Sequence, residues 1–181
     1  MHHRWMTTAA RDRILVLLRH AKTEESNPGG DHDRELTKRG RRDAAEAGRW
    51  LCGIGLGIDE VLCSTAERAS QTCEEVWEAG CSEGEIRHDR RIYNASAEAL
   101  VEVVRDADDD ADVVMVVGHA PGIPALAELL ADGEGSEEGH RAMAEGFPTC
   151  AMAVLHYAGR WSDLAFGDAR LERFHVARDG S

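Results

Sequence analysis

Short apolar runs alternate with longer amphipathic stretches along most of the chain. Consecutive apolar residues predict buried strands, and apolar residues that recur every three or four positions predict helices with one buried face. On this pattern we expect strands at residues 14–18, 61–63, 85–88 and 113–117, and helices at residues 37–52, 66–79, 97–105 and 123–130. The alternation of strands with helices is typical of an α/β protein with a largely parallel sheet.

Three further segments carry local structural signals. Ser64 and Glu67 match a capping box, in which the two side chains accept hydrogen bonds from free amides at the start of a helix. Residues 132–146 are rich in glycine and glutamate, and we expect them to form an exposed loop. Apolar and polar residues alternate over 150–157 and 161–166, on either side of Gly159-Arg160, which predicts a hairpin of two strands.

The size and composition of the chain are typical of one globular domain. Its 181 residues are 43% hydrophobic and 30% charged. We predict a flexible N-terminal extension at residues 1–12, a single domain at residues 13–176 and a tail at residues 177–181. The opening MHHRWMTTAARDR lacks the apolar core of a signal peptide, and Met6 is an alternative start, so the sequence leaves open whether residues 1–12 are native. It also leaves the oligomeric state open.

Charge and cysteine content exclude several classes of protein. A formal net charge of −13 argues against binding to nucleic acid or to an anionic membrane, because both require clustered positive charge. No apolar segment approaches the roughly 18 to 20 residues that span a bilayer. An odd number of cysteines without a C-x-x-C pair predicts neither a disulfide framework nor a thiolate zinc site, and favours a cytoplasmic location. The five cysteines are Cys52, Cys63, Cys73, Cys81 and Cys150.

Arginine and histidine residues follow three of the predicted strands. Arg19-His20 ends the first, Arg68 lies just inside the helix after the second, and His119 follows the valine-rich strand. Taken singly, Arg68 could be a surface arginine and His119 a helix cap. Ligands of open α/β sheets bind at the carboxyl ends of strands, so we expect these side chains to meet there. Guanidinium groups bind phosphoryl oxygens and a neutral imidazole can attack phosphorus, which indicates phosphate chemistry.

The same three segments resemble the motifs of a known family. ILVLLRHAKT, STAERASQT and VVMVVGHAPG resemble, in order, the three motifs of the histidine phosphatase superfamily. This resemblance implies the phosphoglycerate mutase-like fold, a three-layer α/β/α sandwich with a mostly parallel central sheet. Within the superfamily, the segments DHDRELTKRG and RIYNAS resemble the bacterial SixA-type phosphohistidine phosphatases most.

The resemblance also implies roles for individual residues. His20 would attack the phosphoryl group and become transiently phosphorylated, while Arg19, Arg68 and His119 would form the rest of the phosphate pocket. Thr23 would donate a hydrogen bond to the phosphate, or else only cap a loop. An imidazole with an ordinary pKa of about 6.5 is largely neutral in the cytoplasm and needs no separate base, so neither a metal nor a cofactor is expected.

The residue that would protonate the leaving group is not evident. Many superfamily members place a glutamate soon after the second motif, where this chain has Arg90 to Asn94. A phosphoramidate nitrogen can leave already protonated, whereas an alkoxide needs an acid. The departure from the family pattern therefore favours phosphohistidine as substrate. Other acids could still serve from nearby, and the candidates are Tyr93, Glu85, Asp89 and Glu98.

Three functions remain open at this point. The leading one is a phosphatase that acts on phosphohistidine in a protein; the second is a phosphomonoesterase of small metabolites such as sugar phosphates or nucleotides. A non-catalytic module that binds phosphoproteins is the third. Lys22 and Arg34 could widen the basic mouth of the pocket, but we interpret both as solvated surface charge.

Overall fold

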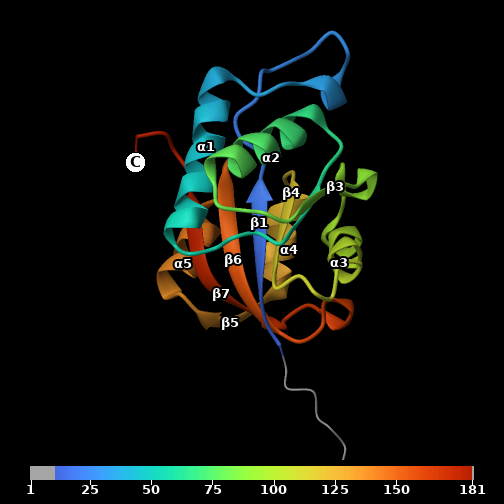
Figure 1. Ribbon diagram of the computed structural model, residues 1–181, viewed down its shortest axis with the longest axis vertical. Helices are drawn as coiled ribbons and strands as arrows, with labels where there is room; N and C mark the ends of the chain where they lie inside the picture. Colours follow the sequence, from blue (N-terminus) through green and yellow to red (C-terminus); the bar gives the residue numbers. More distant parts are fainter. Residues whose placement is uncertain (1–10, 181) are drawn as a thin grey trace, which may run out of the picture.

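The computed structural model describes residues 11–180 and is built around one sheet of seven strands (Figure 1). The strands are β1 (Asp12–Arg19), β2 (Glu60–Cys63), β3 (Glu85–His88), β4 (Val113–Gly118), β5 (Ala131–Gly135), β6 (Ala151–Ala158) and β7 (Ala169–Val176). The helices are α1 (Lys38–Gly53), α2 (Glu67–Ala79), α3 (Ala97–Arg105), α4 (Gly122–Leu130) and α5 (Glu137–Glu145). The strand order is β3-β2-β4-β1-β6-β7-β5. All pairings are parallel except those of β6, which is antiparallel to both β1 and β7.

Helices cover both faces of the sheet. Successive side chains of a strand point to opposite faces, so β1 contributes to two separate apolar clusters. Leu15 and Leu17 pack in the cluster that contains residues of α3 and α4, whereas Val16 and Leu18 pack in the cluster that contains residues of α1 and α2. All four side chains are fully buried. The predicted three-layer α/β/α sandwich with a mostly parallel sheet is therefore confirmed.

The carboxyl ends of β1, β2 and β4 lie together at the upper end of the molecule in Figure 1. The segment between β1 and α1 rises above this end and returns to the start of α1, where the Thr37 hydroxyl accepts a hydrogen bond from the Gly40 amide. A Cβ at Gly40 would lie only 2.1 Å from the carbonyl oxygen of Lys22. Glycine at this position lets α1 pack directly against the segment that covers the strand ends.

Residues 132–146 do not form the expected loop. They contain most of β5, with the exposed sequence ADGEG, and α5. β5 is a strand because its backbone pairs with β7, Ala131 with Ala169 and Gly135 with Leu171. α5 follows Ser136, whose hydroxyl accepts a hydrogen bond from the amide of Gly139.

The prediction of a strand at residues 161–166 is also wrong. Trp161 begins a short 3-10 helix, Trp161–Asp163, and the strand that pairs with β6 is β7, further along the chain. The indole of Trp161 is fully buried and donates a hydrogen bond of 2.8 Å to the carbonyl oxygen of Ala111. Trp161 is apolar because its side chain is buried, but the segment that buries it is the connection between β6 and β7 and not a strand.

The described chain begins its first strand inside the predicted N-terminal extension. Residues 1–10 of the expected extension lie outside the described residues, and Asp12 already belongs to β1. Arg11 forms an ion pair with Asp112. Among residues 11–180, no helix is both long enough and apolar enough to cross a membrane.

Candidate active site

The four residues predicted to bind phosphate meet at one end of the sheet. Arg19 is the last residue of β1 and lies opposite Gly118, the last residue of β4, so His20 and His119 follow two paired strands. Arg68 enters from the first turn of α2. A cavity of about 360 Å³ opens between them. It is lined by the five predicted site residues, Arg19, His20, Thr23, Arg68 and His119, and by Lys22, Arg34, Asn94, Ala120 and Thr149.

His20 is held by a hydrogen bond through one of its two ring nitrogens. Its side chain is only 8% exposed, and Nδ1 lies 2.8 Å from the carbonyl oxygen of Ala21. Because a carbonyl oxygen can only accept a hydrogen bond, Nδ1 carries the proton and Nε2 keeps its lone pair. Burial lowers the pKa of His20 to about 3, so the ring is neutral at physiological pH. The chain therefore presents a neutral imidazole at the floor of the cavity.

His119 faces His20, with ring centroids 5.2 Å apart, and is bound by Ser64. Its Nε2 lies 2.7 Å from Oγ of Ser64, which also accepts a hydrogen bond from the amide of Ala66. The expected capping box is therefore wrong: α2 starts after Ala66 without a side-chain cap. Because the other hydrogen bond of this hydroxyl comes from a donor, the amide of Ala66, we assign the hydroxyl proton to Nε2 of His119, which places the ring proton on Nδ1. Burial lowers the pKa of His119 to about 4.

Three buried side-chain atoms of the site have no hydrogen-bond partner among residues 11–180. They are Nε of Arg19, Nε of Arg68 and Nδ1 of His119. In addition, Nη1 of Arg19 donates to the carbonyl oxygen of Phe147 at 2.9 Å, which fixes this guanidinium from one side. Burying a donor without a partner costs about 1 to 3 kcal/mol. All three residues line the cavity together with the neutral His20, where an oxyanion ligand could supply the missing acceptors.

The segment above the strand ends contributes residues that the sequence did not reveal. Asp31 lies in the short 3-10 helix Asp31–Asp33 and accepts hydrogen bonds from Arg68, Arg34 and Tyr93. Arg34, interpreted above as solvated surface charge, is half-buried, lines the cavity and donates to Oγ1 of Thr23 at 2.5 Å. That interpretation was wrong for Arg34, whereas Lys22 is exposed at the rim of the cavity. The segment DHDR was noted in the sequence, but these contacts could not be predicted from it, because they join residues that lie far apart in the chain.

The candidates for a proton donor differ in position. Glu85 starts β3, at the end of the sheet opposite the cavity, and Asp89 binds Arg91. Glu98 is exposed in the first turn of α3. Tyr93 lies closest to the site: its ring meets the ring of His119 edge-on, with centroids 5.7 Å apart. Its hydroxyl donates to Asp31, and this hydrogen bond raises the pKa of Tyr93 and makes it a weaker acid.

Asp31 is itself a carboxylate. Hydrogen bonds from Tyr93 and Arg34, followed by the nearby charge of Arg68, hold the pKa of Asp31 well below its ordinary value. An ionised carboxyl group cannot donate a proton.

Among residues 11–180, no cluster of three or more His, Cys, Asp or Glu side chains is arranged to hold a metal ion.

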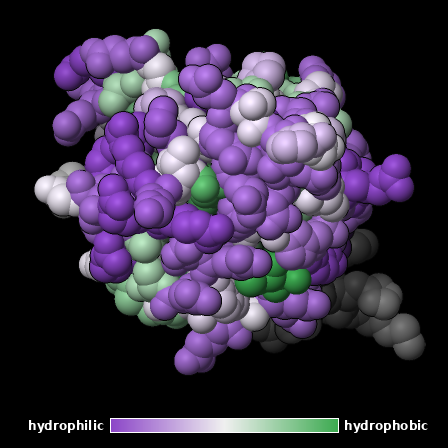
Figure 2. All heavy atoms as spheres, turned by 90° about the horizontal axis from the view of Figure 1, so that it is seen from above, coloured by the Kyte–Doolittle hydropathy of each residue, from purple (hydrophilic) through white to green (hydrophobic). Residues whose placement is uncertain are grey.

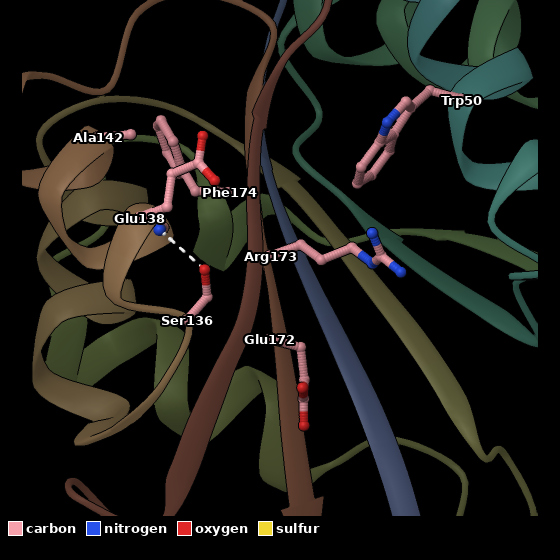
Figure 3. Close-up of a pocket in the computed structure, with 8 residues that line it drawn as sticks. Trp50, Ser136, Glu138, Ala142, Glu172, Arg173 and Phe174 are labelled. Carbon is pink, nitrogen blue, oxygen red and sulfur yellow. Dashed lines mark hydrogen bonds between the residues drawn. The ribbon is translucent and has the colours of Figure 1, made fainter.

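The surface around the site is strongly polar. Figure 2 looks onto the end of the molecule that is uppermost in Figure 1, and hydrophilic residues cover most of this face. A second cavity lies elsewhere, between α1, α5 and β7. Figure 3 shows Trp50 and Arg173 on one side of β7 and Ser136 and Phe174 on the other. This second cavity contains none of the predicted site residues.

Comparison with known proteins identifies the family. The family model of the histidine phosphatase superfamily, branch 1, matches residues 15–95. The uncharacterized protein Rv1276c of Mycobacterium tuberculosis is 39% identical over 162 residues, which cover 89% of this chain and all of that protein. The chain belongs to the histidine phosphatase superfamily. The matched segment contains Arg19, His20 and Arg68, and His119 lies beyond it in the part aligned with the mycobacterial protein.

Solved structures of the superfamily share the whole fold. A provisionally assigned phosphohistidine phosphatase SixA from Nakamurella multipartitia is 33% identical, with a TM-score of 0.80 over 93% of this chain and 98% of that one. A provisionally assigned SixA from Agrobacterium tumefaciens is 30% identical, with a TM-score of 0.72 over 90% of this chain and 97% of that one. This histidine phosphatase is thus a phosphohydrolase with SixA-like structural relatives.

Proposed function

We propose that the protein removes the phosphoryl group from phosphohistidine in a phosphorylated protein, through a covalent phosphohistidine intermediate on His20. The observation that carries this proposal is the set of unpartnered donors of Arg19, Arg68 and His119 around the neutral ring of His20. Phosphoryl oxygens would accept from these donors. Guanidinium groups remain charged at every physiological pH and stabilise negative charge on such oxygens in the transition state.

In the first step, the lone pair of His20 Nε2 forms a bond to phosphorus while the bond from phosphorus to the substrate nitrogen breaks. The positive charge that develops on the His20 ring is stabilised by the hydrogen bond from Nδ1 to the Ala21 carbonyl. In the second step, a water molecule adds to phosphorus, the electron pair of the P–N bond returns to Nε2, and phosphate leaves with both protons of the water, as dihydrogen phosphate. His20 is then again neutral, protonated on Nδ1, and ready for another turnover.

The protonation of the two acidic groups beside the cavity, Asp31 and Tyr93, supports a nitrogen leaving group. Asp31 is ionised, and Tyr93 is a weak acid because its proton is held by Asp31. A phosphohistidine ring that is protonated on its second nitrogen leaves as neutral imidazole and needs no further proton. An alkoxide from a phosphomonoester needs one at the moment of cleavage. Thr23, whose hydroxyl accepts from Arg34 and keeps its own proton, is proposed as an additional donor to the substrate phosphate.

A comparison of substrates tests this function. The wild-type protein would be offered a histidine-phosphorylated peptide and a panel of phosphomonoesters that includes sugar phosphates and nucleotides. We expect the highest kcat/KM with the phosphohistidine peptide, and its loss in His20→Ala. His88→Ala, which alters an exposed histidine at the edge of the sheet, serves as a control and is expected to keep full activity. A preference for monoesters would show instead that the protein is a phosphatase of small metabolites. Full activity of His20→Ala would contradict the assignment of His20 as the nucleophile.

A further inference from the structure

Asp31 joins three side chains that lie around the cavity. Its Oδ2 accepts from Nη2 of Arg68 at 3.1 Å and from the hydroxyl of Tyr93 at 2.6 Å, and its Oδ1 accepts from Nη1 of Arg34 at 3.0 Å. The backbone oxygen of Asp31 also accepts from Nη1 of Arg68 at 2.7 Å. One residue thus contacts both terminal nitrogens of the buried Arg68 and one of Arg34.

Asp31 occupies only part of the donor capacity of Arg68. A guanidinium carries five N–H bonds, of which Asp31 uses two. The Nε proton and one proton on each terminal nitrogen remain, and Nε is buried without a partner. Asp31 itself is half-exposed and does not line the cavity, whereas Arg34 and Arg68 do. The carboxylate therefore holds Arg68 from outside the cavity and does not fill the place of a phosphoryl group.

The segment that carries Asp31 is fixed in the fold. His32, the next residue, lies 3.0 Å from the hydroxyl of Thr65 at the start of the second motif. At the base of the segment, Thr23 bridges to Leu36, and Glu24 accepts hydrogen bonds from the side chain of Asn27 and the amide of Glu35. Asp31 therefore has a defined position from which to orient an arginine.

We propose that Asp31 is a positioning residue that orients Arg68 and Arg34 toward the phosphoryl group. This inference rests on the proposed function of the same cavity, but it makes a separate claim, since it concerns phosphate binding as well as turnover. Removing the carboxylate has two opposite consequences. It makes the pocket more positive, which favours an anion, and it removes one of the contacts that orient each guanidinium group. Arg68 keeps its bond to the backbone oxygen of Asp31, and Arg34 keeps its bonds to Thr23 and to the backbone oxygen of Glu24. The sign of the effect on phosphate affinity shows which consequence dominates.

Asp31→Asn and Asp33→Asn form a matched pair for the test. Both remove one negative charge from the same 3-10 helix, but the carboxylate of Asp33 pairs with His32, at 3.7 Å, and not with an arginine of the cavity. We would measure kcat and KM for the phosphohistidine peptide and competitive inhibition by inorganic phosphate. Misplacing a group that positions the substrate lowers rates by up to about 100-fold. We expect Asp31→Asn to lower kcat/KM by about 10- to 100-fold, mainly through kcat, and to weaken inhibition by phosphate. Asp33→Asn should match the wild type.

Two further variants separate orientation from charge and from folding. Asp31→Glu keeps the charge and is expected to recover part of the lost kcat, while Tyr93→Phe removes one of the donors to Asp31 and should have a smaller effect than Asp31→Asn. Tighter inhibition by phosphate in Asp31→Asn, or equal effects of Asp31→Asn and Asp33→Asn, would overturn the positioning role. Failure of the proposed function would be visible separately, as a wild-type protein without turnover of phosphohistidine, and the phosphate-affinity comparison would still decide the role of Asp31.

Discussion

The hydroxyl of Ser64 lies 2.7 Å from Nε2 of His119, and we assign its proton to this nitrogen because its other hydrogen bond comes from the amide of Ala66. The protonated Nδ1 is then the donor left without a partner beside His20. Ser64 is fully buried at the end of β2, so its contact is protected from water. A residue one strand away thus prepares His119 to donate a hydrogen bond to a phosphoryl oxygen.

Ser64→Ala should therefore impair catalysis more than stability. Without the serine hydroxyl, the His119 ring can adopt either tautomer and loses its fixed orientation. We expect kcat/KM to fall by about tenfold or more, since a lost donor in an oxyanion site has effects of 100-fold and above. Ser70→Ala is the control, because Ser70 makes a similar contact of 3.1 Å with His88 at the surface. Equal activities of the two variants would contradict the role of Ser64.

The low pKa values of His20 and His119 predict an acid-sensitive stability. Both histidines are neutral in the folded protein down to about pH 4, whereas in the unfolded chain they take up protons near pH 6.5. The unfolded state therefore binds more protons between these values, and the free energy of unfolding falls as the pH is lowered from about 6.5 toward 4. Each unit of pKa difference corresponds to about 1.4 kcal/mol.

Urea unfolding at a series of pH values measures this effect. The variant His20→Asn cannot titrate at this position, so its free energy of unfolding should decline less steeply than that of the wild type between pH 6.5 and 4. Surface carboxylates titrate in both proteins and cancel in the comparison. Parallel pH profiles would show that His20 is not held neutral by burial.

Inorganic phosphate should stabilise the folded protein by satisfying the buried donors. At a phosphate concentration 100 times the Kd, binding contributes about 2.7 kcal/mol, which raises the Tm of a protein of this size by about 5 to 10 °C. Arg68→Lys replaces a fork of donors by a single ammonium and is expected to lose most of this shift. Arg41→Lys alters an arginine of α1 that pairs with Glu75 and should keep it. An undiminished shift in Arg68→Lys would remove Arg68 from the phosphate site.

Trp161 offers a test of stability away from the site. Its indole packs near Arg13 and bonds to Ala111, at the end of the sheet where β1 and β4 begin. Trp161→Ala should lower the free energy of unfolding by about 3 to 5 kcal/mol, and Trp161→Phe by less, because a ring still fills the space. Both variants, where folded, should keep the wild-type kcat/KM. A loss of stability below about 1 kcal/mol in Trp161→Ala would show that the indole is not an anchor of this end.

The sequence predicted those parts of the fold that have a strong periodic pattern. β1 and β4 are uninterrupted apolar runs, and α1 has a continuous buried face, so each was recognised near its true bounds. β5 was missed because ADGEG carries no strand signal and is held by backbone pairing with β7, a contact between distant segments. Trp161 was assigned to a strand because it begins a short run of alternating apolar and polar residues. Such a short run does not show whether its apolar residues are buried in a strand or in a connection.

The same distinction applies to the site. Arg19, His20, Arg68 and His119 could be placed together because each follows or begins an element at the carboxyl end of a parallel strand. The contacts of Asp31 with Arg68 and Tyr93 could not, since they span 37 and 62 positions through an irregular segment. Ser64 was noticed for its capping pattern, yet its hydroxyl binds His119, because α2 begins three residues later, at Glu67.

The central claim is that Nε2 of His20 becomes phosphorylated during turnover. Rapid acid-free quenching of the wild-type protein with a phosphohistidine peptide, followed by mass spectrometry, should reveal one phosphoryl group per chain on His20, formed and lost at rates compatible with kcat. His20→Asn should show neither the modification nor turnover. A phosphoryl group on another residue, or turnover by His20→Asn at the wild-type rate, would contradict the account.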